Sequence, residues 1–270
     1  MPENRPSIPE QVKRKVRKIC GFGCAICGMP FFQYDHVEEY ADVKEHTVEN
    51  LVLLCPNHHA AKTTKKLSKE RIVEARKKPF NKDKTLTSSF NVEPSKELLI
   101  QLGSNIVTGW HPEARSEHHS IWINGQSFFT IHNDDDYLTI SMVLTDENGD
   151  ILLLVKKGEL LVSTAAWDYK YEGQNILIRA GLGDILLNLN LSDTKVEILK
   201  GIFLDKNLDG FRVDNGSLIT ILGGESIGTF RNVNWRAYGE GDGGIGLLNA
   251  RSAPHAQRLY YYTVLLEYTD

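Results

Sequence analysis

The sequence predicts an α+β protein in which a small, metal-stabilised domain precedes a larger all-β domain. All four cysteines lie within the first 55 residues, where helical periodicity alternates with short apolar runs. Beyond residue 96 the pattern changes to short runs of β-branched and aromatic residues separated by turn signals. A chain of 270 residues can form two modest domains. We therefore expect a domain over residues 1–80, a linker over 81–96 and an all-β domain over 97–270.

The first domain should contain three helices and two strands. Pro9 suits the first turn of a helix whose apolar residues share one face, and glycines follow at its end. Pro56 begins another helix in the same way, and Ser68 is a suitable N-cap for a third. In chain order we expect a helix over 8–20, a strand within 31–40, a strand over 49–55, a helix from Pro56, and a helix over 68–80.

The second domain follows a polar segment, 81–95, that is rich in Ser, Thr and Asn and reads as a linker. Its short runs predict strands, and the pairs Asn124-Gly125, Asn148-Gly149 and Asn215-Gly216 predict two-residue hairpin turns. A sandwich, a barrel and a short solenoid all fit this pattern.

Charge is distributed unevenly between the two parts of the chain. Residues 1–90 carry a net charge of +6 and residues 91–270 carry −10. This basic first part, or head, joined to an acidic second part suggests that the head binds a polyanion. No apolar run is long enough to span a membrane, and the polar, basic N-terminus does not resemble a secretory signal. We expect a cytoplasmic protein without membrane partners.

Two short motifs predict a structural zinc site. Cys24-x-x-Cys27 and Cys55-x-x-His58 are two knuckles of the spacing that lets one tight turn offer two ligands to the same ion. Together they complete the tetrahedral shell that Zn²⁺ prefers, and such a closed site stabilises a fold without doing chemistry. Cys20 is left over, and we expect it to be buried.

A second set of polar residues lies between and beside these knuckles. Asp35-His36, Asn50 and His59 occur in that order, and His59 immediately follows the last zinc ligand. With the knuckles, "LVLLC" and Lys62, they resemble the HNH nucleases over about residues 10–66. The resemblance implies a ββα-metal fold, in which two strands and a helix grip one divalent cation.

Taken residue by residue, the resemblance implies a role for each matching side chain. His36 would be the general base, and Asp35 and His59 would hold Mg²⁺ or Mn²⁺. Asn50 would fix the loop between the strands. A set of lysines on the helix that begins at Pro56 would contact flanking phosphates: Lys62, Lys65 and Lys66. Thr63 stands where many members have a further histidine, so two protein ligands remain for the cation.

The sequence thus predicts a metal-dependent endonuclease that cleaves phosphodiester bonds in DNA. A non-catalytic zinc DNA-binding protein and an RNA-cleaving nuclease remain as alternatives. By analogy with effectors of prokaryotic antiviral defence, residues 97–270 would control the head by sensing a ligand, binding a regulatory partner or forming a homo-oligomer.

Two further clusters in the second part of the chain contain residue types that bind metals, but their spacing fits a metal site poorly. Asp205, Asn207 and Asp209 begin like a calcium loop, yet position twelve is Gly216 instead of the required glutamate. Three histidines near residue 115 lack knuckle spacing: His111, His118 and His119. We expect no metal at either place.

Overall fold

The computed structural model describes residues 6–88, 90–91, 98–108, 117–134, 137–192, 194–236, 242–252 and 262–268. It divides into two compact units. The head unit comprises Met1–Phe90 and Leu161–Tyr171, and the β unit comprises Asn91–Leu160 and Glu172–Asp270. No helix in the described part of the chain combines the length and the apolar character needed to cross a membrane.

The head unit contains the three predicted helices and the two predicted strands, together with one short helix that the sequence did not indicate. The elements of residues 1–90 are α1 (Glu10–Ile19), β1 (Gln33–His36), α2 (Tyr40–Val43), β2 (Leu51–Leu54), α3 (Pro56–Thr63), α4 (Lys69–Lys77) and β3 (Phe90–Asn91). Pro56 is the first residue of α3, and the Ser68 hydroxyl caps α4 by accepting a hydrogen bond from the Arg71 amide at 3.2 Å. The additional helix, α2, is a single turn that ends at Lys44 in the left-handed conformation.

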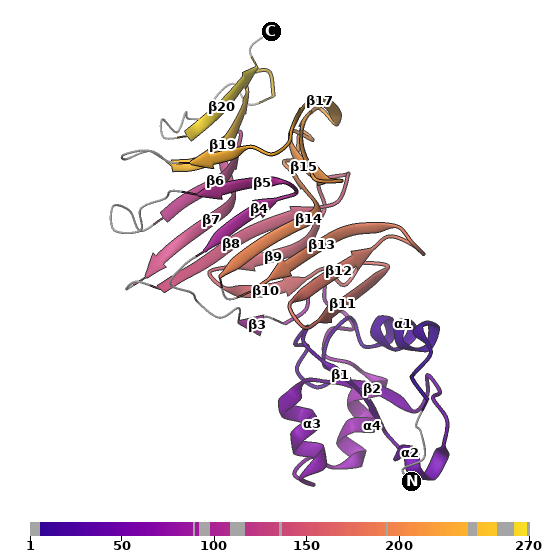
Figure 1. Cartoon of the computed structure of the whole chain (residues 1–270). Helices are drawn as coiled ribbons and strands as arrows, with labels where there is room; N and C mark the ends of the chain where they lie inside the picture. Colours follow the sequence, from indigo (N-terminus) through magenta and orange to yellow (C-terminus); the bar gives the residue numbers. More distant parts are fainter. Residues whose placement is uncertain are drawn as a thin grey trace. The chain divides into compact units, whose positions relative to one another are not determined.

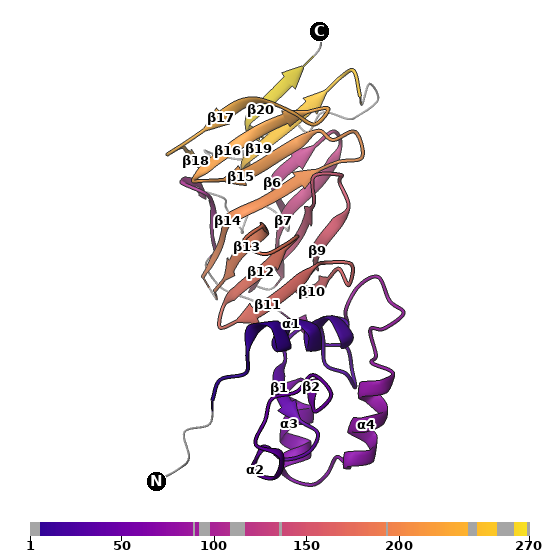
Figure 2. The same cartoon turned by 90° about the vertical axis from the view of Figure 1, so that its right-hand side faces the viewer.

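The antiparallel hairpin of β1 and β2 is the frame of the head unit. Asp35 pairs with Val52 and His36 with Leu51, so the two polar residues of β1 lie opposite an apolar strand. All four residues of β2 are buried and form the centre of the head unit's hydrophobic core. Figures 1 and 2 show α3 and α4 beside this hairpin. The hairpin and α3 therefore give the ββα arrangement that the resemblance implied.

Residues 161–171 belong to the head unit although both flanking segments belong to the β unit. This segment joins the head through main-chain contacts, because Thr87 donates its amide to Val162 at 2.8 Å and Thr164 donates to Thr85 at 2.9 Å. Tyr169 is fully buried. Its ring packs edge-on against Phe22 and other aromatic rings of residues 20–35. The sequence division placed this segment in the all-β domain.

A buried ion pair fixes the same segment to α1. Arg17 and Asp168 are 1% and 3% exposed, and the guanidinium donates two hydrogen bonds to the carboxylate, at 2.7 and 2.8 Å. Arg17 also donates to Glu10 at 2.7 Å and to the Tyr34 hydroxyl. The neighbouring carboxylates and Tyr34 raise the pKa of Arg17 although burial acts in the opposite direction. The guanidinium is therefore held charged inside the head unit.

The β unit is built mainly from antiparallel hairpins, with a few parallel pairings between distant strands. Its strands pair in parallel at β4–β14, β5–β18, β6–β19 and β19–β20. The described strands do not close into a barrel, although a barrel was one of the three predicted architectures. The remaining strands of the chain are β4 (Leu99–Leu102), β5 (Asn105–Thr108), β6 (Glu117–Ile123), β7 (Gln126–Asp134), β8 (Tyr137–Thr145), β9 (Ile151–Lys156), β10 (Glu159–Val162), β11 (Asp168–Glu172), β12 (Asn175–Arg179), β13 (Ile185–Leu191), β14 (Lys195–Leu204), β15 (Gly210–Asp214), β16 (Ser217–Leu222), β17 (Glu225–Phe230), β18 (Asn234–Arg236), β19 (Asp242–Asn249) and β20 (Tyr262–Tyr268).

Two of the three Asn-Gly pairs form the predicted hairpin turns. Both residues of Asn124-Gly125 and of Asn215-Gly216 have positive φ, and the pairs join β6 to β7 and β15 to β16. The prediction for Asn148-Gly149 was wrong, because only the glycine has positive φ. There the Asp146 carboxylate accepts hydrogen bonds from two amides of a longer loop and so stabilises a different turn.

We predict that Arg17→Ala destabilises the protein by about 3–5 kcal/mol, because Asp168 would remain buried without its cation. Chemical denaturation followed by fluorescence measures this change. Arg71→Ala is the control, since the Arg71–Glu74 pair is exposed and should contribute less than about 1 kcal/mol. Equal losses for the two variants would show that the buried pair has no special role.

Candidate active site and metal centre

Four side chains from three parts of the head unit converge on one point. Cys24 and Cys27 lie in the loop between α1 and β1, Cys55 is the N-cap of α3, and His58 is in its first turn. Their ligand atoms all lie within 4.8 Å of one another. In the described part of the chain, no other group of three or more Cys, His, Asp or Glu ligands gathers in this way.

The separations within this cluster fit a tetrahedral zinc ion. The Cys27 and Cys55 sulfurs are 3.8 Å apart, and His58 Nδ1 lies 3.4 Å from the Cys24 sulfur and 3.2 Å from the Cys55 sulfur. Bonds of about 2.3 Å to sulfur and 2.0 Å to nitrogen place tetrahedral ligands about 3.5–3.8 Å apart. The four residues therefore match the predicted zinc set both in identity and in spacing.

The electrostatics of the three cysteines suit a metal-binding role. Hydrogen bonding from Cys27 lowers the pKa of Cys24 to about 5, although burial opposes the shift. The hydrogen bond to Cys24 raises the pKa of Cys27, and burial raises that of Cys55. One thiolate is thus stabilised by its neighbours, and thiolates are the form that binds zinc. Cys20 differs, because burial raises its pKa to about 11 and leaves it a neutral core thiol.

A buried asparagine holds the loop that carries the first knuckle. The Asn81 amide donates hydrogen bonds to the carbonyls of Gly21 and Gly28, at 3.0 and 2.8 Å. Gly28 has a φ of +77°, and a Cβ atom there would meet the Asn81 side chain at 2.2 Å. The sequence placed Asn81 at the start of a linker, since a polar residue 53 positions from its partner gives no local signal.

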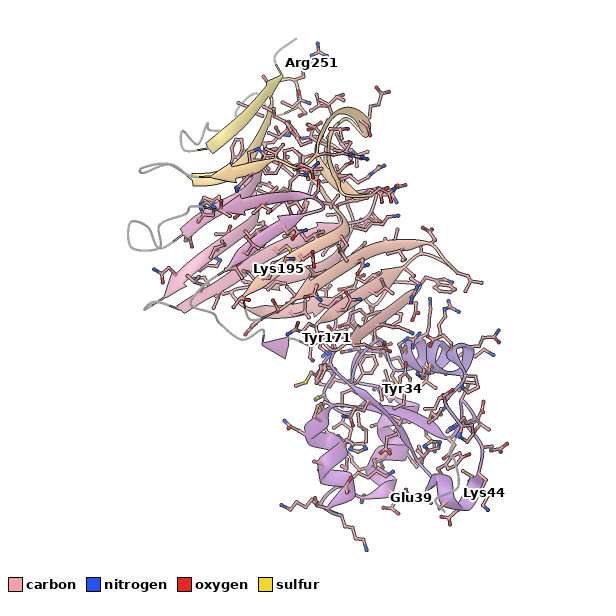
Figure 3. All side chains as sticks on the ribbon, viewed as in Figure 1. Tyr34, Glu39, Lys44, Tyr171, Lys195 and Arg251 are labelled. Atoms are coloured by element: carbon pink, nitrogen blue, oxygen red, sulfur yellow. The ribbon has the colours of Figure 1, made fainter. Side chains whose placement is uncertain are left out.

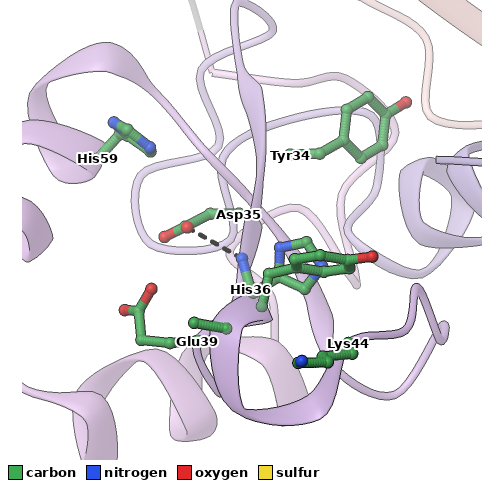
Figure 4. Close-up of a pocket in the computed structure, with 8 residues that line it drawn as sticks. Tyr34, Asp35, His36, Glu39, Lys44 and His59 are labelled. Carbon is green, nitrogen blue, oxygen red and sulfur yellow. Dashed lines mark hydrogen bonds between the residues drawn. The ribbon is translucent and has the colours of Figure 1, made fainter. Parts of the chain in front are cut away.

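Asp35 and His36 project to opposite sides of β1, as strand geometry requires. Figure 4 shows the Asp35 carboxylate on the side of His59 and Glu39, and the His36 ring on the other side of the strand. Asp35, His36 and His59 nevertheless all line one cavity of about 460 Å³. The structure therefore brings together the three residues predicted to act on a phosphodiester.

The fit of a divalent cation beside Asp35 depends on the Asp35 carboxylate and on Lys62. Asp35 Oδ2 is buried and accepts no hydrogen bond, although Lys62 Nζ lies 3.1 Å away in an ion pair. Oδ1 accepts from the His36 amide at 2.9 Å. Asp35, whose Oδ2 has spare acceptor capacity, and His59 line the same cavity, and a carboxylate with an imidazole is a donor set that Mg²⁺ or Mn²⁺ accepts.

Lys62 was predicted to contact phosphate, but in the structure its ammonium lies inside the site. It also donates to the His36 carbonyl at 2.5 Å and pairs with Glu39 at 3.3 Å, and it is only 15% exposed. Lys65 and Lys66, at the end of α3, are exposed. Of the three predicted phosphate contacts, these two are available to a ligand outside the cavity.

Asn50 forms hydrogen bonds within the loop between the strands. Its side-chain oxygen accepts from the Glu38 amide at 2.7 Å, and its side-chain nitrogen donates to the Glu38 carbonyl at 3.1 Å. The Asn50 carbonyl accepts from the Val37 amide at 2.8 Å. These bonds extend the hairpin just beyond His36 and hold its backbone in register.

Three residues of the site were not foreseen from the sequence. Glu39 and Tyr34 line the cavity, and the Tyr34 hydroxyl accepts from Arg17. Figure 3 labels Tyr34 and Tyr171, which both belong to the head unit. His46 contacts the His36 ring, since His46 Nδ1 lies 3.1 Å from His36 Nε2. Each depends on tertiary contacts instead of a spacing motif.

In the calcium-like cluster of the β unit, internal hydrogen bonds engage the buried carboxylate of Asp209. Asp209 is fully buried and accepts from Asn124, Asn249 and the Gly223 amide at 2.8–3.0 Å. Gly216, the twelfth position of the calcium-like loop, lies in a hairpin turn. His118 and His119 are neighbouring residues of β6, and His111 falls outside the described residues.

The comparison with protein families agrees with this geometry. The family model described as HNH endonuclease matches residues 20–65, which include both knuckles, Asp35, His36, Asn50 and His59. Residues 20–65 therefore match the HNH endonuclease domain, and this match supports a nuclease role on nucleic acid in general terms. No curated protein and no solved structure matches the chain significantly.

We predict one zinc ion per chain by elemental analysis of the protein purified without chelator. Cys27→Ser should lose most of this zinc and lower the melting temperature, because metal binding and folding are coupled. Cys20→Ala removes a cysteine outside the cluster and should keep the full zinc content. Loss of zinc from both variants, or from neither, would contradict the assignment of ligands.

Proposed function

We propose that the protein is a metal-dependent endonuclease that hydrolyses phosphodiester bonds in DNA. One observation carries the proposal: Asp35, His36 and His59 line the same cavity within the matched HNH domain. In this proposal Cys24, Cys27, Cys55 and His58 hold a structural zinc ion that sets the position of α3. His59 is not one of these four ligands, and it lines the cavity.

Each of the four predicted catalytic residues has a distinct task in the proposal. His36 takes a proton from the attacking water, for which an imidazole is suited near neutral pH. Asp35 and His59 would hold Mg²⁺ or Mn²⁺. When bound, that cation would stabilise the charge that develops on the phosphate and the leaving oxygen. Asn50 keeps the loop after β1 in place.

Lys62 has a positioning task that differs from the predicted phosphate contact. It bridges the Asp35 carboxylate and the His36 carbonyl, and so it ties the two functional residues of β1 to α3. The exposed Lys65 and Lys66, with the net positive charge of residues 1–90, favour the approach of a polyanion.

We further propose that the β unit influences the nuclease activity of the head unit through residues 161–171. Asp168 of this segment holds Arg17, and Arg17 donates to Tyr34, which lines the cavity next to Asp35. A partner or ligand that displaced this segment would disturb that connection. Cytoplasmic location, a homo-oligomer and a role in prokaryotic defence remain predictions from the sequence alone.

We predict that the full-length protein nicks supercoiled plasmid in the presence of Mg²⁺ or Mn²⁺ and is inactive with excess chelator of these ions. His36→Ala should reduce the rate by at least about 100-fold, because the general base is removed. Gel analysis of nicked and linear plasmid measures the rate, with His132→Ala in the β unit as the control. Equal nicking by wild type and His36→Ala would refute the catalytic assignment, and a structured RNA substrate run in parallel distinguishes the RNA-cleaving alternative.

We also predict that Lys62 and the two exposed lysines affect different steps. Lys65→Ala with Lys66→Ala should weaken DNA binding and reduce the slope of log affinity against log salt by about two, since each phosphate contact contributes about 0.9. Lys62→Ala should leave that slope unchanged and lower the cleavage rate. Fluorescence anisotropy of labelled duplex in chelator gives the slopes. A reduced slope for Lys62→Ala would instead show that Lys62 contacts phosphate, as the sequence predicted.

A further inference from the structure

The His36 ring is held by a chain of hydrogen bonds that leads away from the cavity. His36 Nε2 lies 3.1 Å from His46 Nδ1, and His46 Nε2 lies 2.8 Å from the carbonyl oxygen of Pro6. The His46 ring also stacks on Tyr40, with centroids 4.7 Å apart and planes inclined by 23°. His46 is therefore fixed both by its ring face and by both ring nitrogens.

The direction of these hydrogen bonds follows from the chemistry of the last acceptor. A carbonyl oxygen only accepts, so His46 Nε2 must carry a hydrogen and donate it to Pro6. In the neutral imidazole the other nitrogen, Nδ1, then has the lone pair. His36 Nε2 must in turn carry a hydrogen and donate it to His46. A neutral His36 held this way has its lone pair on Nδ1.

We propose that His46 is a positioning residue that selects the Nε2–H tautomer of His36, so that Nδ1 is the atom that takes the proton from water. The inference rests on the proposed function, in which His36 is the general base. A base whose second nitrogen is bonded to a fixed partner keeps both its tautomer and its ring orientation. Neither the matched motif residues nor the spacing of the knuckles includes His46.

The backbone of His36 is held by other residues than those that contact its ring, so the two can be tested separately. Its amide donates to Asp35 at 2.9 Å, and its carbonyl accepts from Lys62 at 2.5 Å. Its ring contacts Tyr40 edge-on at 5.4 Å between centroids and His46 at 5.1 Å. Substitution of His46 should therefore change the ring of His36 while the backbone and Asp35 stay in place.

The test uses the full-length protein with two substitutions of the same residue. His46→Phe keeps a ring against Tyr40 but removes the acceptor, and kcat should fall about 10- to 100-fold with KM changed less than about twofold. His46→Asn places an amide oxygen near the position of Nδ1 and should recover most of the lost rate. His132→Phe, a matched change at a half-buried histidine of the β unit, should leave kcat unchanged.

A second readout does not require nuclease activity. Long-range proton–nitrogen correlation spectra of the histidine rings, assigned with His36→Ala, should show His36 as the Nε2–H tautomer in wild type and in His46→Asn. In His46→Phe this preference should be lost. The wild-type spectrum alone overturns the inference if His36 carries its hydrogen on Nδ1, even where the Phe variant fails to fold.

The outcomes separate this inference from the proposed function. An active wild type whose kcat is unaffected by His46→Phe refutes the role of His46 and leaves the nuclease assignment intact. An inactive wild type whose His36 tautomer depends on His46 refutes the nuclease assignment and retains the hydrogen-bond relay. Equal losses in the Phe and Asn variants, with an unchanged His36 tautomer, show a structural effect only and overturn the inference.

Discussion

Cys24, Cys27, Cys55 and His58 bring the loop after α1 to the first turn of α3, and the position of the site depends on that junction. β2 ends directly before Cys55, so the same cluster fixes the end of the hairpin to the start of the helix. His59 is the next residue of α3 after the cluster. A shift of the helix by even part of a turn would take His59 away from Asp35. A zinc ion bound by the cluster would hold this distance more rigidly than the small hydrophobic core of the head unit alone.

The His36 side chain shows how a small site can divide its constraints among neighbours. Lys62 and Asp35 act on the main chain of His36, while His46 and Tyr40 act on its ring. A general base needs both supports, because a correctly placed ring in the wrong tautomer is as ineffective as a misplaced one. The two sets of contacts come from different elements. Lys62 and Asp35 belong to α3 and β1, whereas Tyr40 begins α2 and His46 lies in the loop after it.

The sequence predicted the parts of the structure that depend on local spacing. The zinc ligands, the helix start at Pro56, the Ser68 cap and two Asn-Gly hairpins each follow from residues a few positions apart. The assignment of Asp35, His36, Asn50 and His59 came from the family resemblance, and their catalytic roles remain predictions. The local rule failed at Asn148-Gly149, where a side chain outside the pair supplied competing hydrogen bonds.

What the sequence could not predict are contacts between distant residues. Arg17 and Asp168 are 151 positions apart, and Asn81 reaches its partners across 53 and 60 positions. Lys62 was assigned to phosphate through the family resemblance, yet its ammonium forms an ion pair with the Asp35 carboxylate inside the fold. His46 lacked any spacing signal, since only the fold brings it to His36.

The inclusion of residues 161–171 in the head unit has a consequence for the gene as well as for the protein. The polypeptide passes between the two units three times, at residues 90–91, 160–161 and 171–172. One continuous stretch of coding sequence for residues 1–90 would therefore lack Asp168, the buried partner of Arg17. Transfer of the head unit to another protein would have to include residues 161–171 or replace that ion pair.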